Sequence, residues 1–321
     1  MVVSAVSLAI ALSFVDLKKL GEAFQKADYR LVVISASLSL VWLAVRGLFW
    51  RTLLQEKATY RDVFLTLNEG YLLNNVLPFR LGEVARSLLL AQKAALDFWE
   101  VFSTIVIERA MDIAYAVGLV LFSLPFVVNV TWAREAAVLV GIIAIVGWVI
   151  LYLLALNREK VNRAYLSVRD RHNFLQKVGG NALPAFLNGL SILTDGRRFL
   201  RALGWATLNW GITLVQYFIL LRAFFPQAEP IWAVFGLGAA ALGIAAPSSP
   251  GGLGVFEAAL MGALSIAFGV DPTQGFAFAI TAHLLNYLFT SFIGAYALAK
   301  DGETLTGLFR SARSTLARIS G

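Results

Sequence analysis

The sequence predicts an all-α integral membrane protein, a multi-span helical bundle with two re-entrant, broken helix hairpins and an inverted repeat. The class follows from composition, because 59% of the 321 residues are hydrophobic, only 15% are charged and the mean hydropathy is +0.73. Such a chain has too little polar surface to cover a soluble globule. The hairpins follow from two short segments in opposite halves of the chain, residues 77–83 and 249–257, which share a Pro-x-x-Leu-Gly pattern. Paired interruptions of this kind are typical of inverted repeats whose broken helices meet near the bilayer midplane.

Composition also excludes several kinds of site. The chain contains no cysteine, which excludes disulfides, iron–sulfur clusters and thiolate zinc sites. Its two histidines, His172 and His283, lie far apart and match no metal-ligand spacing, so we expect no metal and no cofactor. The net charge of +7 does not indicate a nucleic-acid partner, because the basic residues concentrate in one segment, residues 157–201.

The apolar stretches define the predicted elements in chain order. Residues 2–15 are short for a full span, which favours a truncated or tilted first helix over a cleaved signal peptide. Residues 16–30 form a polar, amphipathic connector, and residues 31–54 form a spanning helix. Four further stretches are long enough to cross the hydrocarbon core, namely residues 98–128, 135–156, 202–225 and 275–299.

The two interrupted stretches are predicted to enter the membrane and return. Residues 60–92 form a helix, a break and a second short helix, and residues 231–246 and 253–269 flank the second break. Two full crossings at 231–269 would give the same topology, but each half is shorter than the about 20 apolar residues that a crossing needs. Non-helical backbone at membrane depth is tolerated only where it is buried in protein or lines a polar cavity. The sequence therefore predicts a cavity between the two halves of the chain.

The breaks define two repeats within a single membrane domain. The first repeat covers about residues 31–128 and carries its break at 74–86. The second covers about residues 202–299 and carries its break at 247–254. We expect the broken segments of the two repeats to face each other.

Basic residues predict the orientation in the cell (plasma) membrane. The segment 157–201 is expected to be a basic cytoplasmic loop by the positive-inside rule. The amphipathic tail, residues 300–321, is also basic and is expected on the same side. It would lie on anionic inner-leaflet lipids.

Charged residues inside the predicted spans are the strongest functional signal. A charge at the bilayer centre costs at least about 2.5–3.5 kcal/mol even on the mildest scale, so unpaired charges would be prohibitive. We expect one inward-facing network of three arginines and three acids, Arg80, Arg86, Arg109, Glu83, Glu108 and Asp112. The network either clamps the first hairpin to its neighbouring helix or leaves an arginine free to bind a phosphate-bearing headgroup, and the two roles can coexist. Arg80 and Arg86 are the best candidates for the second role.

The second break combines glycines with one acid. Gly251, Gly252 and Gly254 let the backbone approach a ligand closely, and the N–H groups at a helix start attract anions. A plain kink with glycine packing between helices is the alternative. Glu257, one turn into the next half-helix, is expected either to pair with an arginine of the first break or to accept a coupling proton.

Two polar stripes recur at helical spacing in the second half of the chain, and hydrogen bonding between helices is their expected role. Their members are Asn209, Thr213 and Gln216, and His283, Asn286 and Tyr287.

Three motifs together resemble those of a known family. They are Asn-Val-Leu-Pro-Phe-Arg-Leu-Gly-Glu-Val-Ala-Arg at 75–86, Glu-Arg-Ala-Met-Asp at 108–112 and Pro-Ser-Ser-Pro-Gly-Gly-Leu-Gly-Val-Phe-Glu at 247–257. In this order they are similar to the flippase-like membrane domain of the lysylphosphatidylglycerol synthases, a group with many stand-alone bacterial and archaeal members. In the two-domain synthases this domain moves an aminoacylated phospholipid to the outer leaflet, while a separate soluble domain attaches the amino acid. The present sequence ends at Gly321 without room for that second domain, so the resemblance implies lipid translocation without aminoacylation.

The resemblance and the charges together predict a lipid flippase or lipid-binding transporter. Its substrate would be a phospholipid or a polyprenyl-phosphate-linked lipid with an anionic headgroup. No nucleotide site is visible, so any energy coupling is expected from a proton, an ion gradient or lipid mass action. The expected substrate-binding residues are Asn75, Arg80, Glu83, Arg86, Gly251, Gly252, Gly254 and Glu257. The expected network and coupling residues are Glu108, Arg109 and Asp112.

Two alternatives stay open. One is an intramembrane transferase acting on a lipid diphosphate, with Glu108 and Asp112 holding Mg²⁺ on one helix face. The other is a non-transporting membrane partner of a separate lipid-modifying enzyme. Assembly into a homo-oligomer is compatible with each of these functions.

Overall fold

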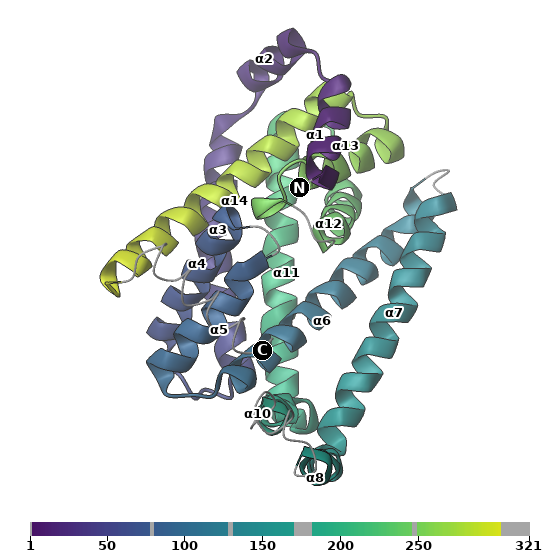
Figure 1. The fold of residues 1–321 in the computed structure, drawn as a ribbon. Coiled ribbons are helices and arrows are strands. Elements are labelled where there is room, and N and C mark those ends of the chain that lie inside the picture. Colours follow the sequence, from purple (N-terminus) through teal and green to yellow (C-terminus); the bar gives the residue numbers. More distant parts are fainter. Residues whose placement is uncertain (1, 78–79, 128–130, 170–181, 246–248, 303–321) are drawn as a thin grey trace.

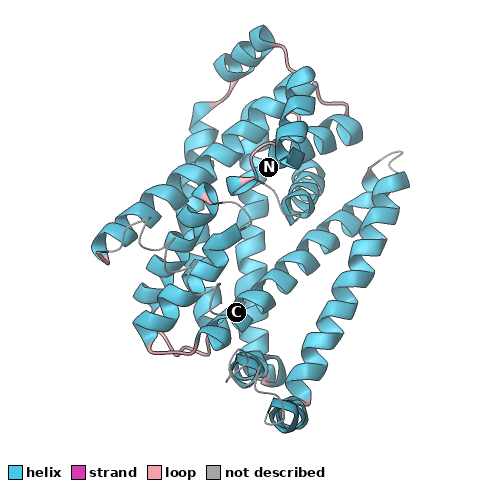
Figure 2. Ribbon diagram, in the orientation of Figure 1, coloured by secondary structure: helices cyan, strands magenta, loops and turns pink. Residues whose placement is uncertain are grey.

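The computed structural model describes residues 2–77, 80–127, 131–169, 182–245 and 249–302. Within these ranges every regular element is a helix (Figure 2), which confirms the predicted all-α class. Pro78, Phe79, Pro247 and Ser248 of the two predicted breaks lie outside the described residues, as does His172. The predicted tail is described only as far as residue 302.

Two short helices form the N-terminal part. α1 (Val2–Ser13) has 12 residues, fewer than the about 20 that a crossing needs, and it packs against α13. α2 (Leu17–Lys26) begins after Asp16, whose carboxylate accepts hydrogen bonds from the backbone N–H groups of Lys18 and Lys19. None of the residues of α2 is buried, as expected for the predicted amphipathic connector.

Four helical stretches are long and apolar enough to cross a membrane. They are α3 (Tyr29–Leu53), Val138–Leu156 within α7 (Thr131–Leu156), Pro250–Phe268, and α14 (Pro272–Lys300). The other two predicted spans are the single helices α6 (Phe98–Ser123), extended by the short turn η2 (Leu124–Phe126), and α11 (Gly196–Phe224). Both are long enough to cross, but they carry the charged and amide side chains of the site described below.

Both predicted breaks interrupt the helices. α4 (Tyr60–Val76) and α5 (Leu81–Ala94) form the first hairpin, and Arg80 between them has a left-handed backbone with φ of 54°. α12 (Pro230–Ala245) and α13 (Val255–Phe268) form the second hairpin, with the short turn η4 (Pro250–Gly252) between them. The two arms of each hairpin pack against each other.

The packing partners are reciprocal between the two halves of the molecule (Figure 1). α3 packs against α11, α4 packs against α14, and α12 packs against α6. The hairpin of each half therefore contacts the last helix of the other half. α5 contacts α6 in the same way as α13 contacts α14. Two units related by a two-fold axis, α3 to α6 and α11 to α14, would produce this pattern.

The structure differs from the prediction in the basic segment 157–201, which was expected to be a loop. Its described part contains α8 (Arg158–Arg169), α10 (Ala182–Gly189) and η3 (Leu190–Thr194). α10 packs against α6 and η3 packs against α7, because Leu187, Leu190 and Ile192 are apolar and become buried there. The surrounding arginines mask this apolar stripe in the hydropathy pattern.

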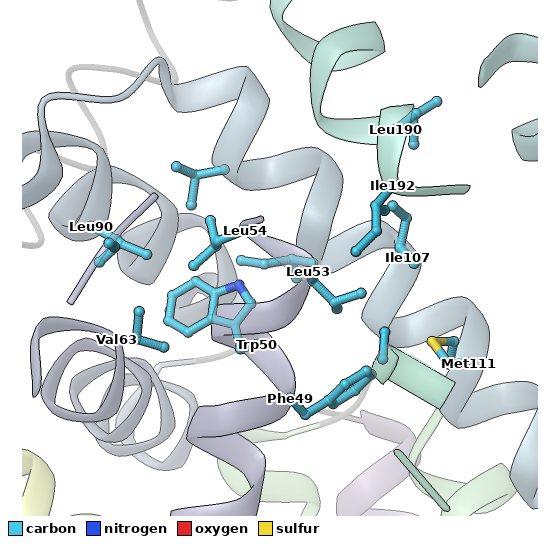
Figure 3. Close-up of a cluster of buried hydrophobic side chains, with 14 of the residues drawn as sticks. Phe49, Trp50, Leu53, Leu54, Val63, Leu90, Ile107, Met111, Leu190 and Ile192 are labelled. Atoms are coloured by element: carbon cyan, nitrogen blue, oxygen red, sulfur yellow. The ribbon is translucent and has the colours of Figure 1, made fainter. Parts of the chain in front are cut away.

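A hydrophobic cluster joins the first hairpin to α3, α6 and η3 (Figure 3). Trp50 of α3 is fully buried within it, together with Leu90 of α5, Ile107 of α6 and Ile192 of η3. The indole N–H of Trp50 donates a hydrogen bond to the Thr104 hydroxyl at 3.0 Å, so its polar atom is also satisfied. This cluster fixes the position of α6 against the hairpin and so positions the charged residues that α6 carries.

Candidate functional site

The two breaks contact each other. The Arg80 guanidinium donates a hydrogen bond to the backbone carbonyl of Ile244 near the end of α12. The Tyr287 hydroxyl of α14 lies 3.2 Å from the carbonyl oxygens of both Asn75 and Pro250, one from each hairpin. A hydroxyl has one proton to donate, so Tyr287 serves one of these carbonyls at a time. Residues far apart in the sequence thus join the tips of both hairpins to α14.

A cavity of about 510 Å³ lies between the breaks. Asn75 and Arg80 of the first break line it, and so does Gly251 of the second. The remaining lining comes from α3, α4, α6, α11, α12, α13 and α14. The cavity expected between the two halves of the chain is therefore present.

A buried carboxylate, Glu108, is the centre of the charge network. Its side chain has no exposed surface and accepts hydrogen bonds from Arg46 at 2.7 Å, Arg86 at 2.8 Å and Arg109 at 2.8 Å. The guanidinium of Arg86 is also buried and lies 4.6 Å from the centroid of the Trp50 ring. Pairing combined with hydrogen bonding is the condition under which buried ions are tolerated.

Asp112 and Glu83 extend the network from Glu108 toward the cavity. Asp112 accepts a hydrogen bond from Arg46 at 2.6 Å and lies 3.2 Å from Arg109. Glu83 lies 3.1 Å from the Nε of Arg109. The structure thus brings all six predicted charges together and adds Arg46.

One positive charge of this network is unmatched. Four arginines face three carboxylates, and Arg80 has the weakest pairing of the four. Among the described residues its one carboxylate partner within 4 Å is Glu83, at 3.8 Å, and Glu83 already binds Arg109. The Arg80 side chain keeps 36% of its surface exposed, against 4% for Arg46. The cavity wall therefore carries an excess of positive charge at the contact of the two breaks.

Arg86 does not lie where it could contact a headgroup in the cavity, although the sequence analysis predicted such a contact. It is buried behind the network, and the cavity lining does not include it. Asn75 does line the cavity, but its amide donates hydrogen bonds to the hydroxyls of Thr290 and Ser291 on α14, at 3.1 and 3.0 Å. Arg80 is therefore the predicted substrate contact of the first break that retains an exposed charge.

The second break turns at glycines whose backbone excludes other residues. Gly251 has φ of 63°, and a Cβ there would lie 1.6 Å from the Tyr287 hydroxyl. Gly254 has φ of 85°, and a Cβ there would lie 2.4 Å from the carbonyl oxygen of Ser4 in α1. Gly251 therefore faces the cavity, whereas Gly254 packs against α1.

Backbone N–H groups of this break are already used within the chain. The N–H of Gly252 donates to the carbonyl of Ser249 at 3.0 Å. The N–H of Gly254 donates to the carboxylate of Glu257 at 2.7 Å, which caps the start of α13. The cavity accordingly presents side chains to a ligand more than these backbone N–H groups.

Glu257 pairs with His283 of α14. The Nδ1 atom of His283 lies 2.5 Å from the Glu257 carboxylate, and its Nε2 atom lies 3.0 Å from the Gly251 carbonyl oxygen. The carbonyl can only accept a hydrogen bond, so Nε2 carries a proton. One further proton then lies between Nδ1 and the carboxylate, giving either an imidazolium with a carboxylate or an imidazole with a carboxylic acid. The pair thus holds one transferable proton next to the second break.

Some site residues escaped the sequence analysis. Arg46, in the middle of an apolar span, links Glu108 and Asp112, and the cost of a lone charge in a span was the signal that could have found it. Both polar stripes make the expected interhelical hydrogen bonds, such as Asn209 to the Trp42 carbonyl and Gln216 to the Ser39 hydroxyl. All six stripe residues also line the cavity, which helical periodicity alone does not show.

These features define an all-helical integral membrane protein with a positively charged cavity between two broken helix hairpins. The chain belongs to the family described as the lysylphosphatidylglycerol synthase TM region, whose model matches residues 1–294.

Curated relatives are distant in sequence. Glycosyltransferase AglD of Haloferax volcanii is 23% identical, and the match covers 95% of this chain and 54% of AglD, so the chain spans about half the length of that relative. A UPF0104 membrane protein of Methanothermobacter thermautotrophicus is 24% identical, over 85% of this chain and 84% of the relative. The UPF0104 membrane protein MJ1078 of Methanocaldococcus jannaschii is 28% identical, over 70% of this chain and 91% of the relative. No solved structure matches the chain.

Proposed function

We propose that this protein binds a membrane lipid with an anionic or phosphate-containing headgroup and moves it between leaflets. The headgroup occupies the cavity while the tails stay in the bilayer. The observation that carries the proposal is the unmatched, partly exposed Arg80 on the cavity wall where the two breaks meet. A guanidinium group binds phosphate oxygens through paired, charge-assisted hydrogen bonds. Membership of a family named for the membrane region of phospholipid-modifying enzymes supports a lipid as the substrate.

An inverted repeat supplies a route for movement. The reciprocal packing of α3 to α6 and α11 to α14 supports this repeat, and transporters of such architecture rock one repeat against the other around a fixed site. Here rocking would exchange the contacts at the tips, since the Tyr287 hydroxyl can donate to Asn75 or to Pro250. The Arg80 bond to Ile244 would open with the same motion.

The Glu257–His283 pair is the best-supported coupling site. The predicted coupling acids Glu108 and Asp112 are bound by guanidinium groups. Glu257 instead has a partner that itself takes up and releases a proton. Because the same pair contacts Gly251 and Gly254, a change in its protonation would act directly on the second break.

The transferase alternative has less support. It requires Glu108 and Asp112 to bind Mg²⁺, but their oxygens already accept hydrogen bonds from arginines. Among the described residues no group of three or more His, Asp or Glu side chains is arranged to hold a metal ion. A cation would have to displace guanidinium groups from a buried site.

Transport in proteoliposomes tests the proposal. Fluorescent phosphatidylglycerol is reconstituted with the full chain, and its loss from the inner leaflet is followed by chemical quenching at the outer surface. Arg80→Gln should slow the exchange by at least about tenfold, because a hydrogen bond to a charged group contributes about 1.5–3 kcal/mol. Arg198→Gln, an exposed arginine of the basic segment, is the matched control and should transport normally. Equal rates for the wild type and Arg80→Gln would refute the proposed role of this arginine.

We further propose that the protein lies in the plasma membrane with the 157–201 segment and the C-terminal tail in the cytoplasm. The chain has no cysteine, so single cysteines can be introduced without a background. Ser167→Cys in α8 should resist an impermeant maleimide in intact cells, and Lys26→Cys in α2 should react. α11 connects these two ends, because it contacts η3 at one end and packs Phe224 on Phe24 of α2 at the other. The reverse labelling pattern would invert the proposed orientation.

A further inference from the structure

The neutral part of the cavity wall indicates what the headgroup carries besides phosphate. We propose that the substrate headgroup is a phosphate bonded to a neutral, polyhydroxylated ring, which is a sugar or a cyclitol. This inference rests on the function proposed above. The cavity of about 510 Å³ falls within the range of about 300–1,000 Å³ that holds a drug-sized ligand, and a phosphate group with its five heavy atoms leaves most of it unfilled.

Aromatic rings form a large share of the wall. Six of them, from five helices in both halves of the chain, line the cavity: Trp42, Tyr71, Trp210, Tyr217, Phe256 and Tyr287. Trp42 and Tyr71 stack on each other with centroids 5.9 Å apart, which holds their ring orientations. The negative face of an aromatic ring attracts the weakly positive C–H groups on the face of a sugar ring. A rigid aromatic wall therefore suits the C–H-rich face of a saturated ring better than a bare phosphate.

Several polar atoms on this wall have no partner in the part of the chain that the structure describes. Four polar side-chain groups of the wall form no hydrogen bond with the described residues. They are the hydroxyls of Tyr71 and Tyr217, the indole N–H of Trp42 and the amide of Asn286. All four groups are neutral. Ligand hydroxyls both donate and accept hydrogen bonds, so they match this mixed set of donors and acceptors.

The same wall disfavours a cationic headgroup. In the described part of the lining the one carboxylate is Asp112, and it is already bound by Arg46, Arg109 and the Trp210 indole N–H. An ammonium group would find no unpaired anion and would face the excess charge of Arg80. A lysyl-bearing headgroup should therefore bind less well than its unmodified parent.

Titration calorimetry of the detergent-purified full chain tests the proposal with defined short-chain lipids. Dioctanoyl phosphatidylinositol carries a phosphate and a cyclitol, and dioctanoyl phosphatidylglycerol carries the phosphate with an open-chain polyol. We expect phosphatidylinositol to bind at least about fivefold more tightly, because two or more added hydrogen bonds contribute about 0.5–1.5 kcal/mol each. Lysyl-phosphatidylglycerol should bind several-fold more weakly than phosphatidylglycerol. A short-chain polyprenyl phosphate hexose, compared with phosphatidylinositol, decides whether the lipid part is an isoprenoid or a diacylglycerol.

A hydroxyl deletion localises the discrimination. Tyr217→Phe should lower the preference for phosphatidylinositol over phosphatidylglycerol by about three- to tenfold, because the ring loses a hydrogen bond that the smaller, open-chain polyol makes less well. Tyr296→Phe, on the exposed side of α14, is the control and should keep the full preference. Equal affinity for the two lipids, or tightest binding of the lysyl lipid, would overturn the proposal while leaving the proposed function intact. A different result would refute the proposed function itself. In that case none of the four test lipids binds more tightly than dioctanoyl phosphatidylcholine, and Arg80→Gln transports lipid normally.

Discussion

Replacing Glu108 with glutamine tests the energetics of the charge network. The Glu108 side chain has no exposed surface and accepts hydrogen bonds from three arginines. Arg46 and Arg109 would keep Asp112 as a partner, but within the described residues Arg86 contacts no other carboxylate. Leaving a buried charge without its partner costs about 3–5 kcal/mol, so Glu108→Gln should lower stability by that amount. Thermal and denaturant unfolding in detergent, followed by tryptophan fluorescence, gives the change.

A double-mutant cycle separates the ion pair from other effects of the substitution. Arg86→Met keeps most of the stem on Trp50 and removes the charge, and its combination with Glu108→Gln removes both charges. The double variant should lose about 0.5–3 kcal/mol less than the sum of the single variants, since the two side chains are in direct contact. Arg201→Met, which breaks a half-exposed pair with Glu56, should change stability by less than about 1 kcal/mol. Additive losses, or a Glu108→Gln loss no larger than that of Arg201→Met, would refute the reasoning.

Three further outcomes are expected. Gly82→Ala should destabilise the first hairpin by about 1–3 kcal/mol in the same unfolding assay, because its Cβ would lie 2.1 Å from the Gly70 carbonyl oxygen. Gly118→Ala is the control and should be neutral or stabilising, because the space around Gly118 is open. Tyr287→Phe removes the hydroxyl shared by the two breaks, so it should lower the free energy of unfolding by about 1 kcal/mol and change the lipid exchange rate. An exchange rate identical to that of the wild type would show that this contact has no role in movement. His283→Gln removes the group that shares a proton with Glu257, so exchange by the variant should lose the pH dependence shown by the wild type, and an unchanged pH profile would exclude this pair as the coupling site.

The sequence predicts the parts of this molecule where chemistry leaves few choices. A proline–glycine interruption inside an apolar stretch cannot continue a helix, so the two interruptions between helices could be predicted with nearly correct boundaries. Charges inside a span must find partners, so Glu108, Arg109 and Asp112 could be assigned to one network before their neighbours were known.

Partner choice required the three-dimensional structure. Glu257 was expected either to pair with an arginine of the first break or to accept a coupling proton. Its partner among the described residues is His283 and no arginine, because α13 packs directly against α14. Arg46 escaped notice as a single charge in a long apolar stretch, although it binds two of the predicted acids. The helices of the basic segment were missed because hydropathy averages over a window, whereas burial depends on one face.

The contact between α1 and the second break has a consequence for biogenesis. The backbone N–H of Ser249 donates to the Ser4 hydroxyl, and that of Asp16 donates to the Thr273 hydroxyl, across 245 and 257 positions of sequence. α1 therefore cannot reach its final place until the chain has been synthesised past residue 273. Until then its apolar face needs other cover, from lipid or from the insertion machinery. Assembly of the second hairpin is accordingly a late step. Substitutions near residue 4 and substitutions near residue 250 should therefore cause the same incompletely folded form of the protein to accumulate.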